Sequence, residues 1–131
     1  MDGDTATYFV ELIQQATNLF TEVEFETDVT PYRAIVRLQA QYGPFRVFIT
    51  ELVAVKGRQY RYYVLRDNWV EAGFDNAPDP RAIRLKYGHI GSDHAREPVP
   101  HLHRQNKTQL ELTQEMTFTG FLIWLQTNLV I

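Results

Sequence analysis

A chain of 131 residues and 15.3 kDa is long enough for one domain, residues 1–131, with its own hydrophobic core. The absence of cysteine excludes disulfides and thiolate metal sites, and it fits a reducing, cytoplasmic location. With 44% hydrophobic and 22% charged residues and no apolar run of membrane-spanning length, we expect a folded protein with no membrane contact.

The net charge of −3 conceals two blocks of opposite sign. Residues 1–30 hold seven acids and no lysine or arginine, whereas residues 31–66 hold seven bases, six of them arginine, against the single acid Glu51. Arginine presents a planar fork that suits phosphate, so the basic block is compatible with nucleic-acid binding. The alternative, which the alternation of the two segments favours, is that the blocks neutralise each other across neighbouring strands.

The N-terminal part of the chain predicts a helix followed by a β-hairpin. The helix is indicated by apolar residues at intervals of three and four, namely Phe9, Leu12, Ile13, Ala16, Leu19 and Phe20. Alternation of side-chain character then predicts strands over 22–29 and 33–42. Folding this pair about residues 30–31 places Phe25 beside Val36 and matches acids with arginines on the outer face.

Three more strands are predicted over 45–55, 58–66 and 69–74, each preceded by a short turn sequence. In the predicted strand 45–55, Glu51 occupies a position at which the alternation requires an apolar residue. A β-bulge near Leu52, which resets the alternation, is the favoured interpretation. An inward-facing carboxylate is the alternative, and it would be a candidate functional group.

Residues 75–107 are predicted to form one long functional loop, because four prolines and two glycines interrupt any regular period. A short strand at 108–112 and a helix at 120–129 complete the chain. The helix is apolar nearly all round, which suits either a homodimer or partner contact or a deeply docked terminal helix.

This order of elements predicts an α+β fold. The expected architecture is an antiparallel β-meander of five to six strands, with the N- and C-terminal helices packed on one face. The sequence contains no internal repeat that would suggest a solenoid.

All four histidines lie within fifteen residues, between His89 and His103. Imidazole titrates near neutral pH, so such a cluster is suited to proton transfer or metal binding. His101 and His103 are two residues apart, so on an extended segment both side chains point the same way, roughly 6–7 Å apart. His89 and His94 are more simply explained as hydrogen-bonding residues of the loop.

Three short motifs carry a resemblance to a known family. They are Phe74-Asp75-Asn76-Ala77-Pro78 at a strand end, Pro100-His101-Leu102-His103, and Phe118-Thr119 at the start of the last helix. Over residues 45–129 the chain resembles the TumE family, small toxin components of bacterial and archaeal type II toxin–antitoxin pairs. The resemblance implies a toxin with a cognate antitoxin protein as partner, and RNA cleavage is the expected activity of such toxins. The chain departs from the family pattern at Leu102, which replaces a histidine, and in a longer loop between the first two motifs.

The residues themselves are suited to metal-independent RNA cleavage, which requires a base, an acid and cations for the phosphate. The proposed catalytic residues are His101, His103 and Asp75, with Asp93 as another carboxylate able to orient an imidazole. The proposed RNA-binding residues are Arg66, Arg104 and Lys107 for phosphate, and Tyr62 and Trp69 for base stacking.

Two alternatives stay open at this point. One is a zinc or manganese site made by His101 and His103 with Asp75 or Asp93. The other is a non-catalytic protein-binding module that docks a partner through the apolar C-terminal helix and uses the histidines to shape the loop.

Overall fold

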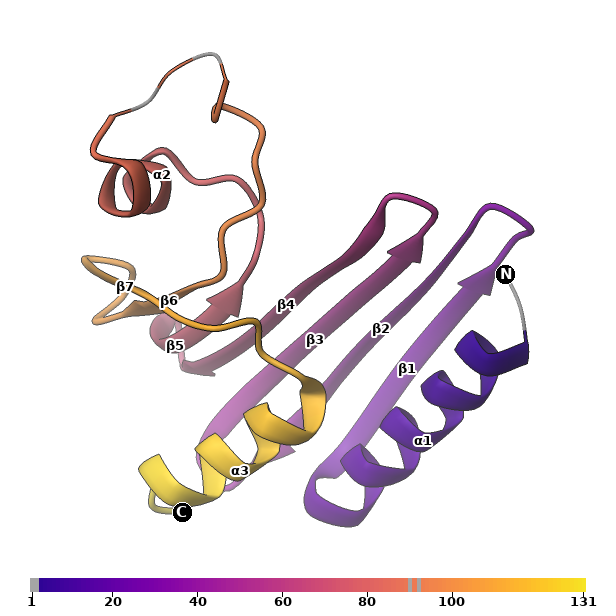
Figure 1. Cartoon of the computed structure of the whole chain (residues 1–131). Helices are drawn as coiled ribbons and strands as arrows, with labels where there is room; N and C mark the ends of the chain where they lie inside the picture. Colours follow the sequence, from indigo (N-terminus) through magenta and orange to yellow (C-terminus); the bar gives the residue numbers. More distant parts are fainter. Residues whose placement is uncertain (1–2, 90, 92) are drawn as a thin grey trace.

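The computed structural model describes residues 3–89, 91 and 93–131. Within these residues the chain forms three helices and one antiparallel sheet, whose seven strands follow one another in chain order. The elements are α1 (Gly3–Leu19), β1 (Thr21–Val29), β2 (Arg33–Tyr42), β3 (Phe45–Ala54), β4 (Gly57–Arg66), β5 (Trp69–Asp75), α2 (Pro80–Tyr87), β6 (His101–Arg104), β7 (Gln109–Leu112) and α3 (Phe118–Asn128). The predicted α+β meander is confirmed, with more strands than the five to six expected (Figure 1).

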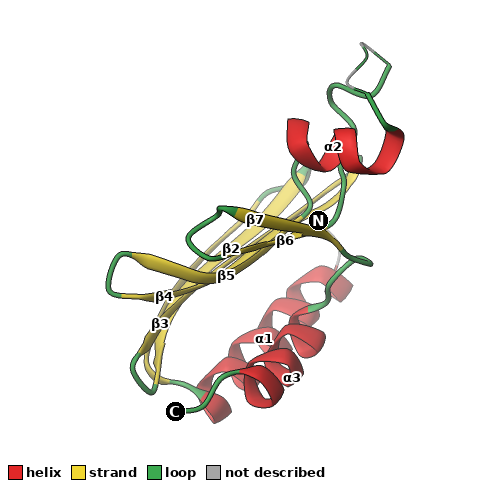
Figure 2. Ribbon diagram, turned by 90° about the vertical axis from the view of Figure 1, so that its left-hand side faces the viewer, coloured by secondary structure: helices red, strands yellow, loops and turns green. Residues whose placement is uncertain are grey.

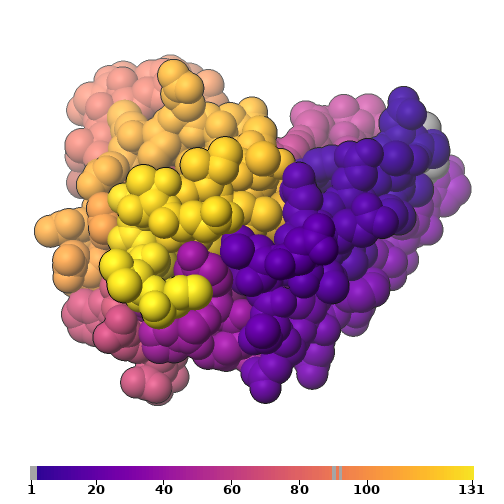
Figure 3. All heavy atoms as spheres, turned by 90° about the horizontal axis from the view of Figure 1, so that it is seen from below, coloured from indigo at the N-terminus to yellow at the C-terminus, as the bar shows by residue number. Residues whose placement is uncertain are grey.

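The terminal helices α1 and α3 pack on the same face of the sheet, as the sequence predicts (Figure 2). Seen from below, they lie side by side (Figure 3), and the Gln15 side-chain amide donates a hydrogen bond of 3.2 Å to Thr119 Oγ1. In α3, Phe121 and Leu125 are fully buried, whereas Ile123 is 60% exposed. Docking on the sheet therefore accounts for most of the apolar surface of this helix. None of the described helices is both long and apolar enough to cross a bilayer.

The register of the first hairpin differs from the prediction. Phe25 lies opposite Leu38, not Val36, so the pairing is displaced by two residues. Residues 30–33 form the turn, closed by a hydrogen bond of 2.8 Å from the first N–H to the last carbonyl. Because the displacement is an even number, each side chain keeps its predicted face.

The bulge predicted near Glu51 is wrong. Strand β3 pairs without interruption with β2 and β4, so Glu51 points into the core between the sheet and the helices, where it is fully buried. Its carboxylate accepts hydrogen bonds from the Tyr62 hydroxyl at 2.6 Å, the Tyr8 hydroxyl at 2.8 Å and Arg58 Nε at 3.0 Å. These partners satisfy the buried charge, so no bulge is needed to remove it.

Arg58 connects this carboxylate to the end of the chain. Its Nη2 group donates to Tyr62 and, at 2.9 Å, to the carbonyl of Met116, while Nη1 forms an ion pair of 3.1 Å with Glu115. Burial and the neighbouring Glu51 carboxylate raise the pKa of Tyr62, so its hydroxyl stays a protonated donor. We refer to Tyr8, Glu51, Arg58 and Tyr62 as the Glu51 cluster.

The predicted loop 75–107 contains two regular elements. Helix α2 begins at Pro80, which suits the first helical position because that residue needs no N–H partner. Asp79 caps the helix by accepting a hydrogen bond of 2.8 Å from the Arg81 N–H. Residues His101–Arg104 form β6, which pairs with β5 and β7. The proline pair therefore marks a helix start and not a continuous loop.

We predict that Glu51→Ala lowers the free energy of unfolding by about 3 kcal/mol, because it leaves the partly buried Arg58 without its counter-charge. Urea denaturation measures the loss. Glu26→Ala is the matched control, since Glu26 forms an exposed ion pair with Arg37 and should contribute less than about 1 kcal/mol. Equal effects of the two substitutions would contradict a structural role for the Glu51 cluster.

Candidate functional site

His101 and His103 project from β6 onto the face of the sheet that α1 and α3 leave uncovered. Leu102 between them belongs to the core on the helix side, and successive side chains on a strand point to opposite faces. Asp75, the last residue of β5, lies directly opposite His101. Strand pairing thus brings the two sequence motifs together.

Helix α2 lies on this same face, at the β7 end of the sheet. Leu110 of β7 pairs with His103 and packs against a small apolar cluster that includes Ala82 and Ile83 of α2. Between α2 and the strands lies a pocket of about 320 Å³ that both histidines line, here called the histidine pocket. Its lining also includes three cations, Arg61, Arg81 and Lys107.

A chain of hydrogen bonds assigns the protons of the two imidazoles. His101 Nδ1 lies 2.6 Å from the carbonyl oxygen of Val99, which can only accept, so Nδ1 carries a proton. With both imidazoles neutral, His101 Nε2 is the acceptor, and His103 Nε2–H donates to it across the 3.1 Å between the two nitrogens. His103 Nδ1 is left as an acceptor that faces Arg81 Nη2 at 3.4 Å. Two neutral imidazole rings are sufficient to form all three of these hydrogen bonds.

The protonation of His103 follows from its surroundings. Burial is the main cause that lowers the pKa of His103 to about 4, and the neighbouring His101 and the Lys107 ammonium act in the same direction. At neutral pH the His103 ring is therefore uncharged and keeps a lone pair for a proton.

The expected separation of 6–7 Å between the two histidines is wrong for the ring nitrogens. The rings lean together at an interplanar angle of 89° with centroids 4.7 Å apart. An acid and a base in this arrangement cannot stand on opposite sides of one phosphate, so His101 and His103 form one proton-transfer unit.

Asp75 contacts cationic and backbone groups. Its carboxylate accepts a hydrogen bond of 2.6 Å from the Ala77 N–H and pairs with Arg61 Nε at 3.5 Å. Tyr63 Oη lies 3.5 Å from the same carboxylate. These contacts with described residues support a role for Asp75 in positioning Arg61. The sequence had instead suggested that Asp75 orients a histidine ring.

Lys107 is brought to the pocket by an unusual turn. Gln105, Asn106 and Lys107 all have left-handed backbones, with φ of 51°, 53° and 68°. Residues other than glycine adopt this conformation rarely, so three in succession store strain of the kind often found at functional sites. The turn holds the Lys107 ammonium 5.0 Å from the centre of the Tyr63 ring.

Four predicted RNA-binding residues lie outside the histidine pocket. Arg104 points to the opposite face from His103, with its guanidinium 5.8 Å from the ring of Trp124. Tyr62 is fully buried in the core, where no base can stack on it. Arg66 and Trp69 face each other at the end of β5 that is remote from the pocket.

The pocket is lined instead by Arg61, Arg81 and Tyr63. The sequence alone did not identify the two arginines as site residues. Arg61 could have been identified from the register, because it pairs with Asp75. Arg81 carries no local signal, since α2 was predicted as loop. Of the predicted phosphate-binding residues, only Lys107 lines the pocket.

The same groups include a potential set of metal ligands. One ligand atom each from Asp75, His101 and His103 lies within 4.8 Å of the others, and all three residues are buried. Asp93 is not among them; it lies with His89 and His94 in a separate, more exposed group. Of the two carboxylates that the sequence offers for a metal site, Asp75 lies with His101 and His103, and Asp93 does not.

Either ring nitrogen of a histidine can serve as the ligand atom, and the neutral pair keeps one lone pair on each ring, at His101 Nε2 and at His103 Nδ1. Zinc or manganese suits two imidazoles and a carboxylate.

The four histidines thus divide into two pairs, the buried His101 and His103 and the more exposed His89 and His94. His94 stacks on Tyr87 with ring centroids 3.8 Å apart and contacts Glu97 through Nδ1 at 2.9 Å. These contacts agree with the structural role that the sequence favours for this residue.

Comparisons of the chain with family models, curated proteins and solved structures found no match.

Proposed function

We propose that the histidine pocket binds a phosphodiester of RNA and cleaves it without a metal ion, with His103 as the base. The observation that carries this proposal is the pair of hydrogen-bonded histidines beside three cations in one pocket. The neutral pair is able to take a proton, and the cations offset the charge that develops on the phosphate.

In the proposed reaction, His103 Nδ1 accepts the proton of the ribose 2′-hydroxyl while Arg81 turns to the phosphate. The 2′ oxygen attacks phosphorus, and the bond to the 5′ oxygen of the next nucleotide breaks. His101 shares the positive charge through its hydrogen bond with His103, and the pair returns the proton to the leaving 5′ oxygen. The products are a 2′,3′-cyclic phosphate and a 5′-hydroxyl.

The biological role that we propose is that of the toxin in a type II toxin–antitoxin pair, with a cognate antitoxin protein as partner. Its support is the resemblance of the Asp75-Asn76 and His101-Leu102-His103 motifs to the TumE family. A cytoplasmic location agrees with this role, because RNA and the antitoxin would both be met there.

A metal-dependent nuclease is the second candidate, favoured by the proximity of the Asp75, His101 and His103 ligand atoms. The metal-free reaction is preferred because the three cations that line the pocket can already offset the charge of the phosphate. The third possibility, a binding module without catalysis, follows if neither reaction is observed.

We predict that His103→Ala reduces cleavage of single-stranded RNA by about 10²- to 10⁴-fold, the usual effect of a positioned proton-transfer group. His101→Ala should act in the same direction. Because His103 is buried, the volume-preserving His103→Gln is tested beside it, with circular dichroism to verify the fold. His94→Ala is the matched control from the same histidine cluster and should cleave as the wild type does. Undiminished cleavage by the folded His103 variants would refute the proposed role.

A second prediction separates the metal-free from the metal-dependent reaction. Cleavage by the proposed mechanism should continue in the presence of a chelator, and the fragments should carry 2′,3′-cyclic phosphate ends, identified by mass spectrometry. Loss of activity with chelator and its recovery with zinc or manganese would support the metal-dependent alternative instead.

The pH dependence provides a third prediction. The base must be neutral, and the pKa of His103 is lowered to about 4, so kcat/KM should fall as the pH drops through about 4 and stay high toward neutrality. NMR titration of the His103 ring measures the same pKa directly. An acidic limb near pH 6.5, the value of an ordinary histidine, would show that another group acts as the base.

A further inference from the structure

Two neighbouring rows of side chains cross the face of the sheet that α1 and α3 leave uncovered, and both begin at the histidine pocket beside α2. The first row, here the aromatic row, holds in order from β6 to β2 His103, Gly73, Tyr63, Phe48 and Gln39. The second, here the arginine row, holds in the same order His101, Asp75, Arg61, Thr50 and Arg37. Both run across the strands, because each residue is the cross-strand partner of the next.

The aromatic row changes from a packed to an open surface as it leaves the pocket. A Cβ atom on Gly73 would lie 2.8 Å from the Tyr63 ring, so the glycine allows that ring to lie over β5 toward His103. Two strands further along the sheet from Gly73, Phe48 is 40% exposed. An exposed aromatic ring on a sheet is the usual platform for an unpaired RNA base.

The charge on this face is positive between the pocket and β1. The helix-free face of β2–β4, which the structure describes in full, presents four arginines and no acid, namely Arg33, Arg37, Arg46 and Arg61. Arg37 forms an ion pair of 3.5 Å with Glu26 of β1, in which both side chains are more than half exposed. Such a pair is weak, so a phosphate can replace the glutamate.

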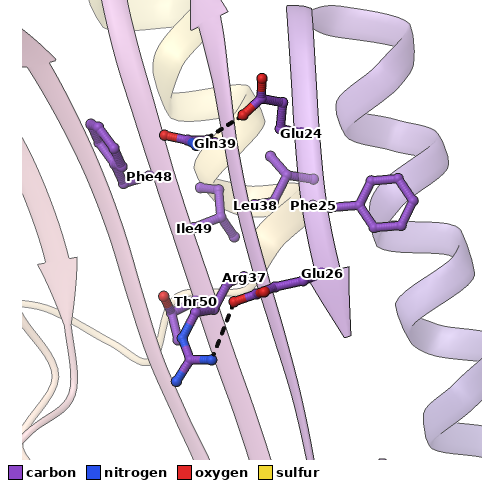
Figure 4. A pocket seen from close by; sticks show the side chains of 9 residues that line it. All are labelled: Glu24, Phe25, Glu26, Arg37, Leu38, Gln39, Phe48, Ile49 and Thr50. Carbon is purple, nitrogen blue, oxygen red and sulfur yellow. Dashed lines mark hydrogen bonds and ion pairs between the residues drawn. The ribbon is translucent and has the colours of Figure 1, made fainter. Parts of the chain in front are cut away.

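The surface between these residues is hollowed. A depression of about 340 Å³ shares Arg61 and Tyr63 with the histidine pocket and extends to Phe48 and Thr50. A second, of about 420 Å³, continues from Phe48 and Thr50 to Arg37. Figure 4 shows the second one, with Arg37 and Thr50 beside each other on neighbouring strands and Phe48 farther along β3. Three adjoining hollows therefore lead from the histidines to β2.

We infer that the RNA strand cleaved in the histidine pocket continues across β4, β3 and β2 as a single strand, with a base stacked on Phe48 and phosphates at Arg61 and Arg37. This inference rests on the proposed function of the pocket. Phe48 lies three strands from His103, roughly 14 Å at the usual strand spacing. That distance suits the two or three nucleotides that sheet-based RNA-binding domains hold. A duplex would keep its bases away from Phe48, and the acidic β1 limits the path on the far side.

The test measures binding of a fluorescent 2′-O-methyl oligouridylate, which lacks the attacking hydroxyl, to the full chain by anisotropy. Phe48→Ala should raise Kd by about 5- to 150-fold, the range found when a stacked base loses its platform. Arg37→Ala should reduce the slope of log Kd against log salt by about 0.7, the value for one phosphate contact on a single strand. Trp69→Ala, an exposed aromatic residue at the remote end of β5, and Arg66→Ala are the matched controls.

Weaker binding by the Phe48 and Arg37 variants, with both controls unchanged, would support the path. If the wild type binds and cleaves RNA but the Phe48 and Arg37 variants bind equally well, the path is wrong and the proposed function stands. If Trp69→Ala is the variant that loses affinity, the strand runs toward the other end of β5, and the path is again wrong. If the wild type neither binds nor cleaves RNA, both the proposed function and the path fail.

Discussion

The buried Glu51 carboxylate is the interaction on which the arrangement of the helices depends. Taking a carboxylate out of water is costly, and only a complete set of donors offsets that cost. Here the donors come from α1 and β4, and one of them, Arg58, also donates to the Met116 carbonyl in the segment that leads into α3. The two terminal helices are thereby tied to the same point of the sheet. The ring of Tyr62 adds an apolar contact by packing 5.1 Å from the ring of Phe121 in α3.

The position of both terminal helices on one face determines what the other face can do. The pleat of β4 sends Arg58 toward the Glu51 side chain and Arg61 to the opposite face, beside Asp75. The basic block of the sequence is therefore divided between structural and surface roles by the alternation of the strands. Among the helices that the structure describes, α2 alone covers part of the second face, and the pocket forms between it and the strands β4 to β6.

The two buried polar systems of the protein differ in charge and in purpose. At Glu51, a charged carboxylate is held by several donors, an arrangement that stabilises and specifies the fold. At His101 and His103, single hydrogen bonds link the two rings to each other and to the Val99 carbonyl, and the remaining nitrogen of His103 faces the guanidinium of Arg81. The strained turn before β7 holds Lys107 beside these histidines, which is the kind of local cost that functional sites carry.

The sequence by itself determined the features that depend on near neighbours: the terminal helices, the positions of the first five strands, the faces of the side chains in β1 and β2, and the grouping of His101 with His103. Tertiary structure decided the rest. The hydrogen bond that closes the turn at residues 30–33 set the register of the first hairpin. Strand β6 forms because it pairs with β5, a partner that the local sequence does not indicate. Glu51 turned inward because Tyr8, distant in the chain, supplies a donor there. Arg61 and Arg81 likewise lie beside the histidines only in the folded protein. The periodicity of a sequence indicates which face of the sheet a side chain is on. The partners that satisfy its polar groups are set by the tertiary structure.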